Sequence, residues 1–186
     1  MQGIAHIGTQ IRLSPLPLLA RAMCIAARQT PEVNSFWDAG AQEIVTKHYV
    51  NLGIATATDR GLLVPNVKNA DRLTLKELTQ AIAEVVAAAR AGKTEPAQMT
   101  GGTMSITNIG IFGIDAGSPI LPLGQSAIIS LGAGVERPWV VDGEIVVRQV
   151  TTLALSFDHR LVDGAQGSKF LFDIAHMLNE PANIAS

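Results

Sequence analysis

Apolar residues recur at helical spacing in three segments of the chain. The first covers about residues 14–30 and opens with a serine followed by a proline, which are favoured at the cap and in the first turn of a helix. The second covers about residues 74–90, where Thr74 and Glu77 match a capping box. The third covers about residues 165–178. The spacing therefore predicts three amphipathic helices.

Between these helices, short runs of alternating or continuous apolar residues predict strands. An Asp-Gly pair between two of the runs is typical of a tight hairpin. A polar loop is expected over residues 93–102, and a long glycine- and proline-rich loop follows residue 109. Residues 1–13 give too weak a pattern for an assignment. The predicted strands cover residues 45–57, 61–65, 103–109, 126–131, 140–145 and 151–157.

The predicted strands cluster along the chain and do not alternate strictly with helices. This order favours an α+β fold, in which a mixed β-sheet has helices packed against it, over a doubly wound nucleotide-binding fold. The sequence contains no GxGxxG or GxxxxGK[ST] motif, so no phosphate-binding loop is predicted. We expect a single domain over residues 1–186.

The composition is apolar for a soluble chain of this size, with 47% hydrophobic and 16% charged residues. We therefore expect other copies of the chain to cover part of the apolar surface. The net charge of -2 gives no electrostatic reason to bind nucleic acid or an anionic membrane. Cys24 is the one cysteine and is expected to be buried. Because the sequence also shows no signal peptide, no transmembrane span and no zinc-type spacing, a cytoplasmic protein without a metal is expected.

The candidate chemistry lies in residues 156–164, which read Ser-Phe-Asp-His-Arg-Leu-Val-Asp-Gly. His159 leaves the end of a predicted buried strand shortly before a predicted helix. Such a corner can project a side chain into a cleft while the flanking elements hold it still. On residue types alone, a structural histidine is the commoner outcome of this pattern. Asp158 and Arg160 are expected to have structural roles.

The other histidines lack a comparable neighbourhood. His48 lies in a predicted strand and is expected to face solvent. His176 is expected on the surface of the last helix, and His6 lies in the unassigned start of the chain. His159 is therefore the candidate catalytic group.

Residues 158–164, Asp-His-Arg-Leu-Val-Asp-Gly, resemble the active-site signature of the dihydrolipoyl acyltransferases, the core components of 2-oxo acid dehydrogenase complexes. They are also similar to the His-x-x-x-Asp-Gly motif of chloramphenicol acetyltransferase. Residues 16–34, 60–67 and 101–110 resemble further blocks of the family and occur in the family's order. The resemblance implies a chloramphenicol acetyltransferase-like fold and the transfer of an acyl group between dihydrolipoamide and coenzyme A.

The resemblance also implies roles for single residues. His159 would take the proton from the thiol of coenzyme A or dihydrolipoamide, and Thr107 would donate to the oxyanion of the tetrahedral intermediate. Asn108, in the same block, would contact the substrate. Asp163 would support the geometry of the site. In relatives with an aspartate at this position it pairs with an arginine near the domain start, for which Arg12 is the candidate.

Coenzyme A and lipoamide are substrates in this family, and no metal is implied. The resemblance implies a homotrimer whose acyltransfer channel lies between two subunits, with coenzyme A entering at one end and the lipoyl arm at the other. His159 of one chain would meet Thr107 of its neighbour. A larger core assembly and the 2-oxo acid decarboxylase and dihydrolipoamide dehydrogenase components would be further partners.

Two features depart from the family's pattern. The chain begins late within the family's domain and carries no lipoyl or subunit-binding domain, so a shortened catalytic core is expected. The family's leucine-rich tail, which docks into a neighbouring trimer, is replaced by residues 179–186, where Ile184 is the one candidate anchor.

Two other interpretations stay open. One is a stand-alone acyl-coenzyme A transferase of the chloramphenicol type. The other is a non-catalytic structural core or binding component of the same complexes, although relatives with that role tend to lack the histidine. Acetyl, branched-chain and succinyl enzymes share these motifs. The Glu136–Gly143 segment resembles actinobacterial branched-chain acyltransferases, which slightly favours a branched-chain acyl group.

Overall fold

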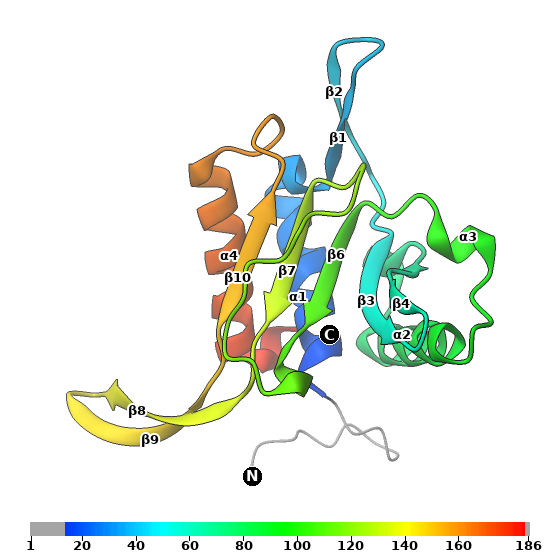
Figure 1. Cartoon of the computed structure of the whole chain (residues 1–186). Helices are drawn as coiled ribbons and strands as arrows, with labels where there is room; N and C mark the ends of the chain where they lie inside the picture. Colours follow the sequence, from blue (N-terminus) through cyan, green and yellow to red (C-terminus); the bar gives the residue numbers. More distant parts are fainter. Residues whose placement is uncertain (1–13, 185–186) are drawn as a thin grey trace.

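A computed structural model describes residues 14–184. His6 and Arg12, for which the sequence raised expectations, lie outside the described residues. Six strands form one sheet at the centre of the molecule (Figure 1). They are β3 (Leu52–Thr58), β4 (Gly61–Leu63), β5 (Asn66–Val67), β6 (Met104–Asn108), β7 (Ala127–Leu131) and β10 (Leu153–Phe157).

The order of the strands in this sheet is β10-β7-β6-β3-β4, and β5 pairs with β3. β3, β6 and β7 run parallel to one another. β10 is antiparallel to β7, and both β4 and β5 are antiparallel to β3. The sheet is therefore mixed, which confirms the predicted α+β fold.

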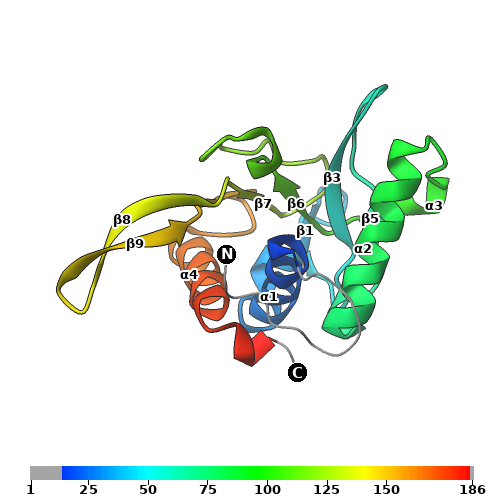
Figure 2. The same cartoon turned by 90° about the horizontal axis from the view of Figure 1, so that it is seen from below.

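Three helices cover one face of the sheet (Figure 2). They are α1 (Pro15–Gln29), α2 (Leu75–Arg90) and α4 (Gly164–Asn179). The capping box between Thr74 and Glu77 opens α2, as predicted. The apolar side of each helix contributes to the core, where Leu19, Leu78 and Phe170 are fully buried. The helical spacing of apolar residues thus identified the buried faces of α1 and α2.

The long loop that joins β6 to β7 crosses the opposite face of the sheet (Figure 2). The Ser130 hydroxyl donates to the Gly117 carbonyl oxygen over 2.6 Å. The Ser105 hydroxyl donates to the side-chain oxygen of Gln125 over 2.5 Å. These hydrogen bonds attach the glycine- and proline-rich loop to the sheet.

Two hairpins extend away from the central sheet (Figure 1). β1 (Ser35–Asp38) and β2 (Glu43–Thr46) form one. β8 (Val135–Val141) and β9 (Glu144–Val150) form the other, which we call the arm. The arm turns at Asp142 and Gly143, whose φ angles of 52° and 85° match the predicted Asp-Gly turn. The shorter elements are η1 (Pro31–Asn34), η2 (Ala70–Arg72), α3 (Pro96–Met99), η3 (Gly110–Phe112) and η4 (Pro181–Ile184).

The strand predicted over residues 45–57 is divided in the structure. A bend at His48 and Tyr49 separates β2 from β3, so His48 does not lie in a strand, although its side chain is exposed as expected. The Asn34 side-chain amide donates to the Lys47 and Tyr49 carbonyl oxygens, each over 2.9 Å. This non-local contact fixes the bend and is not visible in the local apolar pattern. The predicted polar loop over residues 93–102 contains α3, a single helical turn.

Ile184 is a further difference from the expectation. Its side chain is fully buried, and the η4 turn that carries it packs against α1 and α4. Ile184 is therefore part of this chain's own core and does not project as an anchor for a neighbouring trimer.

Candidate active site

Asp158 organises the turn that follows β10. Its backbone amide donates to the Ser126 carbonyl oxygen over 2.9 Å, and its own carbonyl oxygen accepts from the Leu161 and Val162 amides. Its carboxylate accepts from the Arg160 guanidinium over 3.0 and 2.6 Å. Hydrogen bonding from Arg160 lowers the pKa of the Asp158 carboxyl, outweighing the partial burial that acts to raise it. Both residues have the structural role that the sequence predicted.

His159 follows within the same turn, and its side chain is exposed. The centroid of its imidazole ring lies 5.5 Å from that of the Phe157 ring, with the two planes inclined at 47°. Across the part of the chain that the structure describes, no hydrogen bond occupies the imidazole nitrogens. An accessible imidazole without a competing partner can accept a proton from a bound thiol.

Asp163, four residues after His159, caps the start of α4. Its carboxylate accepts from the Gln166 amide over 2.8 Å, and the Gln166 side-chain oxygen accepts from the Asp163 amide over 2.8 Å. The box fixes the point at which the turn becomes α4. The expected pairing of Asp163 with Arg12 involves a residue outside the described range.

Thr107 and Asn108 lie at the carboxyl end of β6. Ile106 is fully buried in the core, so by alternation Thr107 lies on the loop-covered face of the sheet. Thr107 is half-buried, and its hydroxyl bonds to no other residue of the described range. The Asn108 side-chain oxygen accepts from the Gly110 amide over 3.1 Å, which turns the chain into η3.

The structure does not bring His159 and Thr107 together within one chain. The register of the sheet aligns Thr107 with Ser130 on β7 and with Ala154 on β10. His159 lies five residues beyond Ala154, and β7 separates β10 from β6. At ~3.3 Å per residue and ~4.8 Å per strand, the two side chains originate roughly 15–20 Å apart. One thioester cannot contact both residues of the same chain.

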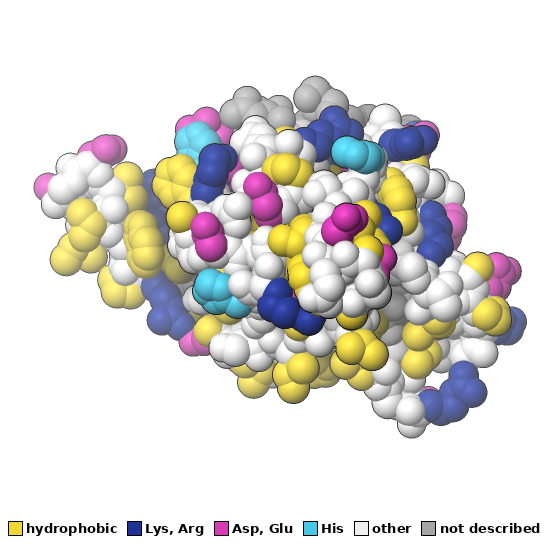
Figure 3. All heavy atoms as spheres, turned by 90° about the horizontal axis from the view of Figure 1, so that it is seen from above, with side chains coloured by type: hydrophobic (Ala, Val, Ile, Leu, Met, Phe, Trp, Pro, Cys, Tyr) yellow, Lys and Arg dark blue, Asp and Glu magenta, His cyan; other side chains and the backbone are white. Residues whose placement is uncertain are grey.

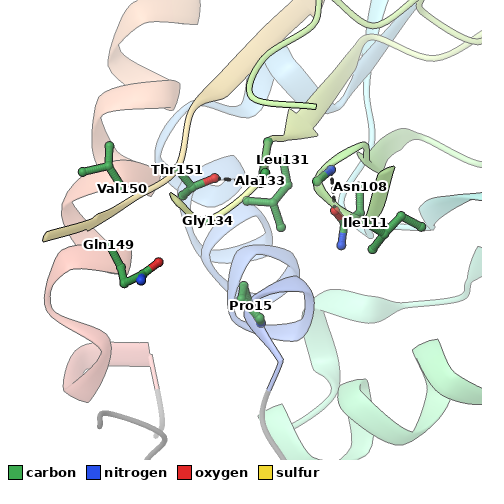
Figure 4. Close-up of a pocket in the computed structure, with 11 residues that line it drawn as sticks. Pro15, Asn108, Ile111, Leu131, Ala133, Gly134, Gln149, Val150 and Thr151 are labelled. Carbon is green, nitrogen blue, oxygen red and sulfur yellow. Dashed lines mark hydrogen bonds between the residues drawn. The ribbon is translucent and has the colours of Figure 1, made fainter. Parts of the chain in front are cut away.

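A pocket of about 400 Å³ lies at the Asn108 end of the sheet (Figure 4). Asn108, Ile111 and Leu131 line it from the sheet and the following loop, and Gln149 and Thr151 line it from the base of the arm. His159 is not among the residues that line it. The sequence did not single out Gln149, because a polar residue in an alternating strand carries no local signal of a pocket.

The end of the molecule at which β10 finishes and α4 begins has mixed charge. Figure 3 shows acidic and basic side chains interspersed there with apolar ones, in keeping with the net charge of -2. Among residues 14–184, no group of three or more histidine, cysteine, aspartate or glutamate side chains could hold a metal ion. No helix of the described chain is long and apolar enough to cross a membrane.

The mixed sheet with helices on one face has the arrangement of a chloramphenicol acetyltransferase-like fold. A solved chloramphenicol acetyltransferase has this fold, with a TM-score of 0.55 over 89% of this chain and 78% of that chain at 14% identity. The family model of the 2-oxoacid dehydrogenases acyltransferase catalytic domain matches residues 3–186. The chain belongs to this family.

Relatives within the family include acetyltransferase components of pyruvate dehydrogenase complexes. The chain is 42% identical over 171 residues to the dihydrolipoyllysine-residue acetyltransferase component of the pyruvate dehydrogenase complex of Bacillus subtilis, covering 92% of this chain and 39% of that protein. It thus spans about two fifths of that relative's length. The dihydrolipoamide acetyltransferase structure of Azotobacter vinelandii has a TM-score of 0.88 at 31% identity, over 95% of this chain and 72% of that chain. A cubic core of the pyruvate dehydrogenase multienzyme complex has a TM-score of 0.88 at 32% identity, over the same shares.

Proposed function

We propose that this chain transfers an acyl group between dihydrolipoamide and coenzyme A within a 2-oxo acid dehydrogenase complex. The observation that carries the proposal is the exposed imidazole of His159, held between an edge strand and a capped helix in a chain of this family. Residues 1–186 would form the catalytic core domain of the enzyme.

In this proposal His159 is the general base. A thiol with an ordinary pKa near ~8.5 is mostly protonated at neutral pH, so the imidazole first removes the proton of the coenzyme A thiol. The thiolate attacks the carbonyl carbon of the acyl-dihydrolipoamide thioester, forming a new C–S bond and an oxyanion. Collapse of this intermediate breaks the original C–S bond, and the departing sulfur of dihydrolipoamide takes the proton from the imidazolium. The reverse reaction uses the same steps.

Thr107 donates its hydroxyl hydrogen to the oxyanion. Because Thr107 and His159 of one chain originate at opposite ends of the sheet, a complete site takes its histidine and its threonine from two copies. A homotrimer satisfies this requirement, and the similarity to a cubic pyruvate dehydrogenase core supports assembly beyond the trimer.

The Azotobacter vinelandii acetyltransferase also supports these assignments. Its structure belongs to an investigation of the role of a serine, a histidine and an asparagine in that enzyme's catalytic mechanism. These three residues follow one another at the same spacings as Thr107, His159 and Asp163. In our proposal Asp163 maintains the geometry of the site by capping α4. Asn108 contacts the substrate from the pocket at the end of β6.

The acyl group in this proposal is acetyl. The Bacillus subtilis relative is an acetyltransferase component of a pyruvate dehydrogenase complex, which supports this choice. The Glu136–Gly143 segment, which favoured a branched-chain group, lies on the arm, and the Bacillus subtilis relative gives that preference no support. The partners are the decarboxylase and dihydrolipoamide dehydrogenase components, in the reducing cytoplasm expected for a chain with one buried cysteine.

The test offers acetyl-, isobutyryl- and succinyl-coenzyme A with dihydrolipoamide to wild type and to His159→Ala. We expect acetyl transfer to be fastest in wild type and to fall by about 10²–10⁴-fold in His159→Ala, the usual contribution of a general base. Circular dichroism and thermal unfolding should be unchanged because the imidazole is exposed. His48→Ala, which removes another exposed imidazole, is the matched control and should retain turnover.

Equal turnover in wild type and His159→Ala would move the chemistry to another residue. A stable trimer that transfers none of the three acyl groups would instead assign the chain to the non-catalytic core of a complex. Both outcomes contradict the proposal.

A further inference from the structure

The Phe157 ring lies beside the candidate base His159, whose imidazole has no hydrogen bond within the described chain. We propose that Phe157 positions the His159 imidazole, and that the absence of a side chain at Gly167 leaves room for the Phe157 ring. This inference rests on the function proposed for His159. The 5.5 Å between the two ring centroids lies within the ~4.5–7 Å range of favourable aromatic pairs. A catalytic histidine is ordinarily oriented by a hydrogen bond to a third group, and here the ring of Phe157 takes that place.

Phe157 is well placed to act as a fixed support. It is the last residue of β10, and it pairs with Ala127 of the neighbouring strand. Its side chain is half-buried and packs against the core. His159, two residues further, is exposed and has left the strand. The core and the sheet therefore fix the phenyl ring, and the phenyl ring in turn limits the positions of the imidazole.

Gly167 determines how closely α4 approaches this ring. A Cβ atom at Gly167 would lie 2.6 Å from Cε1 of Phe157, closer than real Cβ atoms approach another atom, and a tight 3.1 Å from Cζ. The helix is held at this point, because the Gly167 amide donates to the Asp163 carbonyl oxygen over 2.9 Å and Phe170 is fully buried one turn further on. A methyl group at position 167 would therefore displace the phenyl ring more readily than the helix.

A displaced phenyl ring would change the orientation of the imidazole. Phe157 does not need to touch the substrate for this effect, so it is a positioning residue. Misplacing a reacting group by ~1 Å can cost up to about 10²-fold in rate. Loss of orientation lowers kcat, whereas binding of coenzyme A through its other contacts leaves KM nearly unchanged.

The test compares Phe157→Leu, Gly167→Ala and the double variant. Phe157→Leu removes the ring but keeps an apolar side chain, and we expect kcat to fall about tenfold while KM for coenzyme A stays within about twofold. Gly167→Ala should lower both kcat and the midpoint of urea unfolding. In the double variant, leucine leaves room for the new methyl group, so the unfolding midpoint should recover from that of Gly167→Ala while kcat stays at the level of Phe157→Leu. Recovery of kcat together with stability would mean that Phe157 acts only in packing and would overturn the proposal.

Gly164→Ala is the matched control in the same helix, because a Cβ at Gly164 meets no atom within 4 Å. A nuclear Overhauser contact between the Phe157 and His159 ring protons gives a readout that does not depend on turnover. It should be present in wild type and Gly164→Ala and weaker in Gly167→Ala. Retained turnover in His159→Ala overturns the function proposed above. An unchanged ring contact and unchanged kcat in Gly167→Ala overturn the positioning proposal alone.

Discussion

Among single residues, Asp158 carries most of the hydrogen bonds that shape the histidine turn. We expect Asp158→Asn to lower the free energy of unfolding by about 1 kcal/mol at neutral pH, a small value because Arg160 is exposed and the ion pair is screened. Urea unfolding measures this change, and turnover should fall with it. Asp173→Asn, which breaks the Lys169–Asp173 surface pair within α4, is the control and should cost less than about 0.5 kcal/mol. Equal losses of unfolding free energy in the two variants would mean that the turn does not depend on Asp158 more than α4 depends on a surface ion pair.

The free energy of unfolding should depend on pH because the Asp158 carboxylate is stabilised in the folded protein. The pKa of Asp158 is lowered from its ordinary value of 3.8 by the Arg160 hydrogen bond. Its contribution to stability is therefore fully present above that ordinary value and is lost as the pH falls through the lowered folded-state pKa. The difference in unfolding free energy between wild type and Asp158→Asn should be constant from about pH 5 to 8 and shrink below about pH 4. A difference that persists undiminished in strong acid would point to packing instead of charge.

Cys24 is buried and is expected to be unreactive in the folded protein. Burial, with a smaller contribution from the Asp71 carboxylate, raises the pKa of the Cys24 thiol to about 12. Because the thiolate is the reactive form, we expect a disulfide reagent at about pH 8 to label no thiol in the native protein and one per chain in urea. Absorbance of the released chromophore measures both. Rapid labelling of the native protein with loss of turnover would contradict the buried, inert role predicted from the sequence.

The sequence is informative about some residues of the site and not about others. His159, Asp163 and Thr107 were predicted because they lie in motifs that can be recognised in one dimension. Phe157 was predicted only as an apolar strand residue. Its contact with His159 depends on how the chain leaves β10, and its contact with Gly167 depends on how α4 packs on the sheet. Packing of this kind has no signature in the local pattern.

At the scale of elements, the helices were predicted better than the strands. Capping residues are local signals, and the boxes at Thr74 and Asp163 place the starts of α2 and α4 within a residue or so of the predicted positions. The hairpin of β1 and β2 was missed, since four-residue strands give little periodicity. The Asp-Gly turn of the arm was predicted, but its separation from the central sheet was not. Strand pairing depends on contacts distant in sequence, which an apolar pattern does not specify.

At the scale of the whole molecule, apolar side chains remain exposed near the Thr107 end of the sheet. On the arm, Trp139 is 53% and Ile145 is 75% exposed, and on the loop after β6, Phe112 is 64% exposed. The arm begins four residues after β7, whose last residue pairs with Asn108 beside Thr107. Exposed apolar area of this kind marks contact surfaces. A neighbouring copy that brings its His159 to this end would cover part of it, as the composition predicted.

If the site is shared between copies, two inactive variants should restore activity when they are mixed, which a site within one chain would not allow. His159→Ala lacks the base, and Thr107→Ala lacks the oxyanion donor, which usually costs about 10²–10³-fold in kcat. The two variants would be dissociated, mixed in equal amounts and reassembled. If each site takes its histidine from one chain and its threonine from the next, a site is intact where a Thr107→Ala chain supplies His159 and its His159→Ala neighbour supplies Thr107. Random mixing around a closed trimer makes this about one site in four, so we expect about a quarter of wild-type turnover from two nearly inactive proteins. A mixture no more active than the average of its components would mean that His159 and Thr107 act within one chain. That result would contradict the separation of roughly 15–20 Å that the sheet register sets between the two residues.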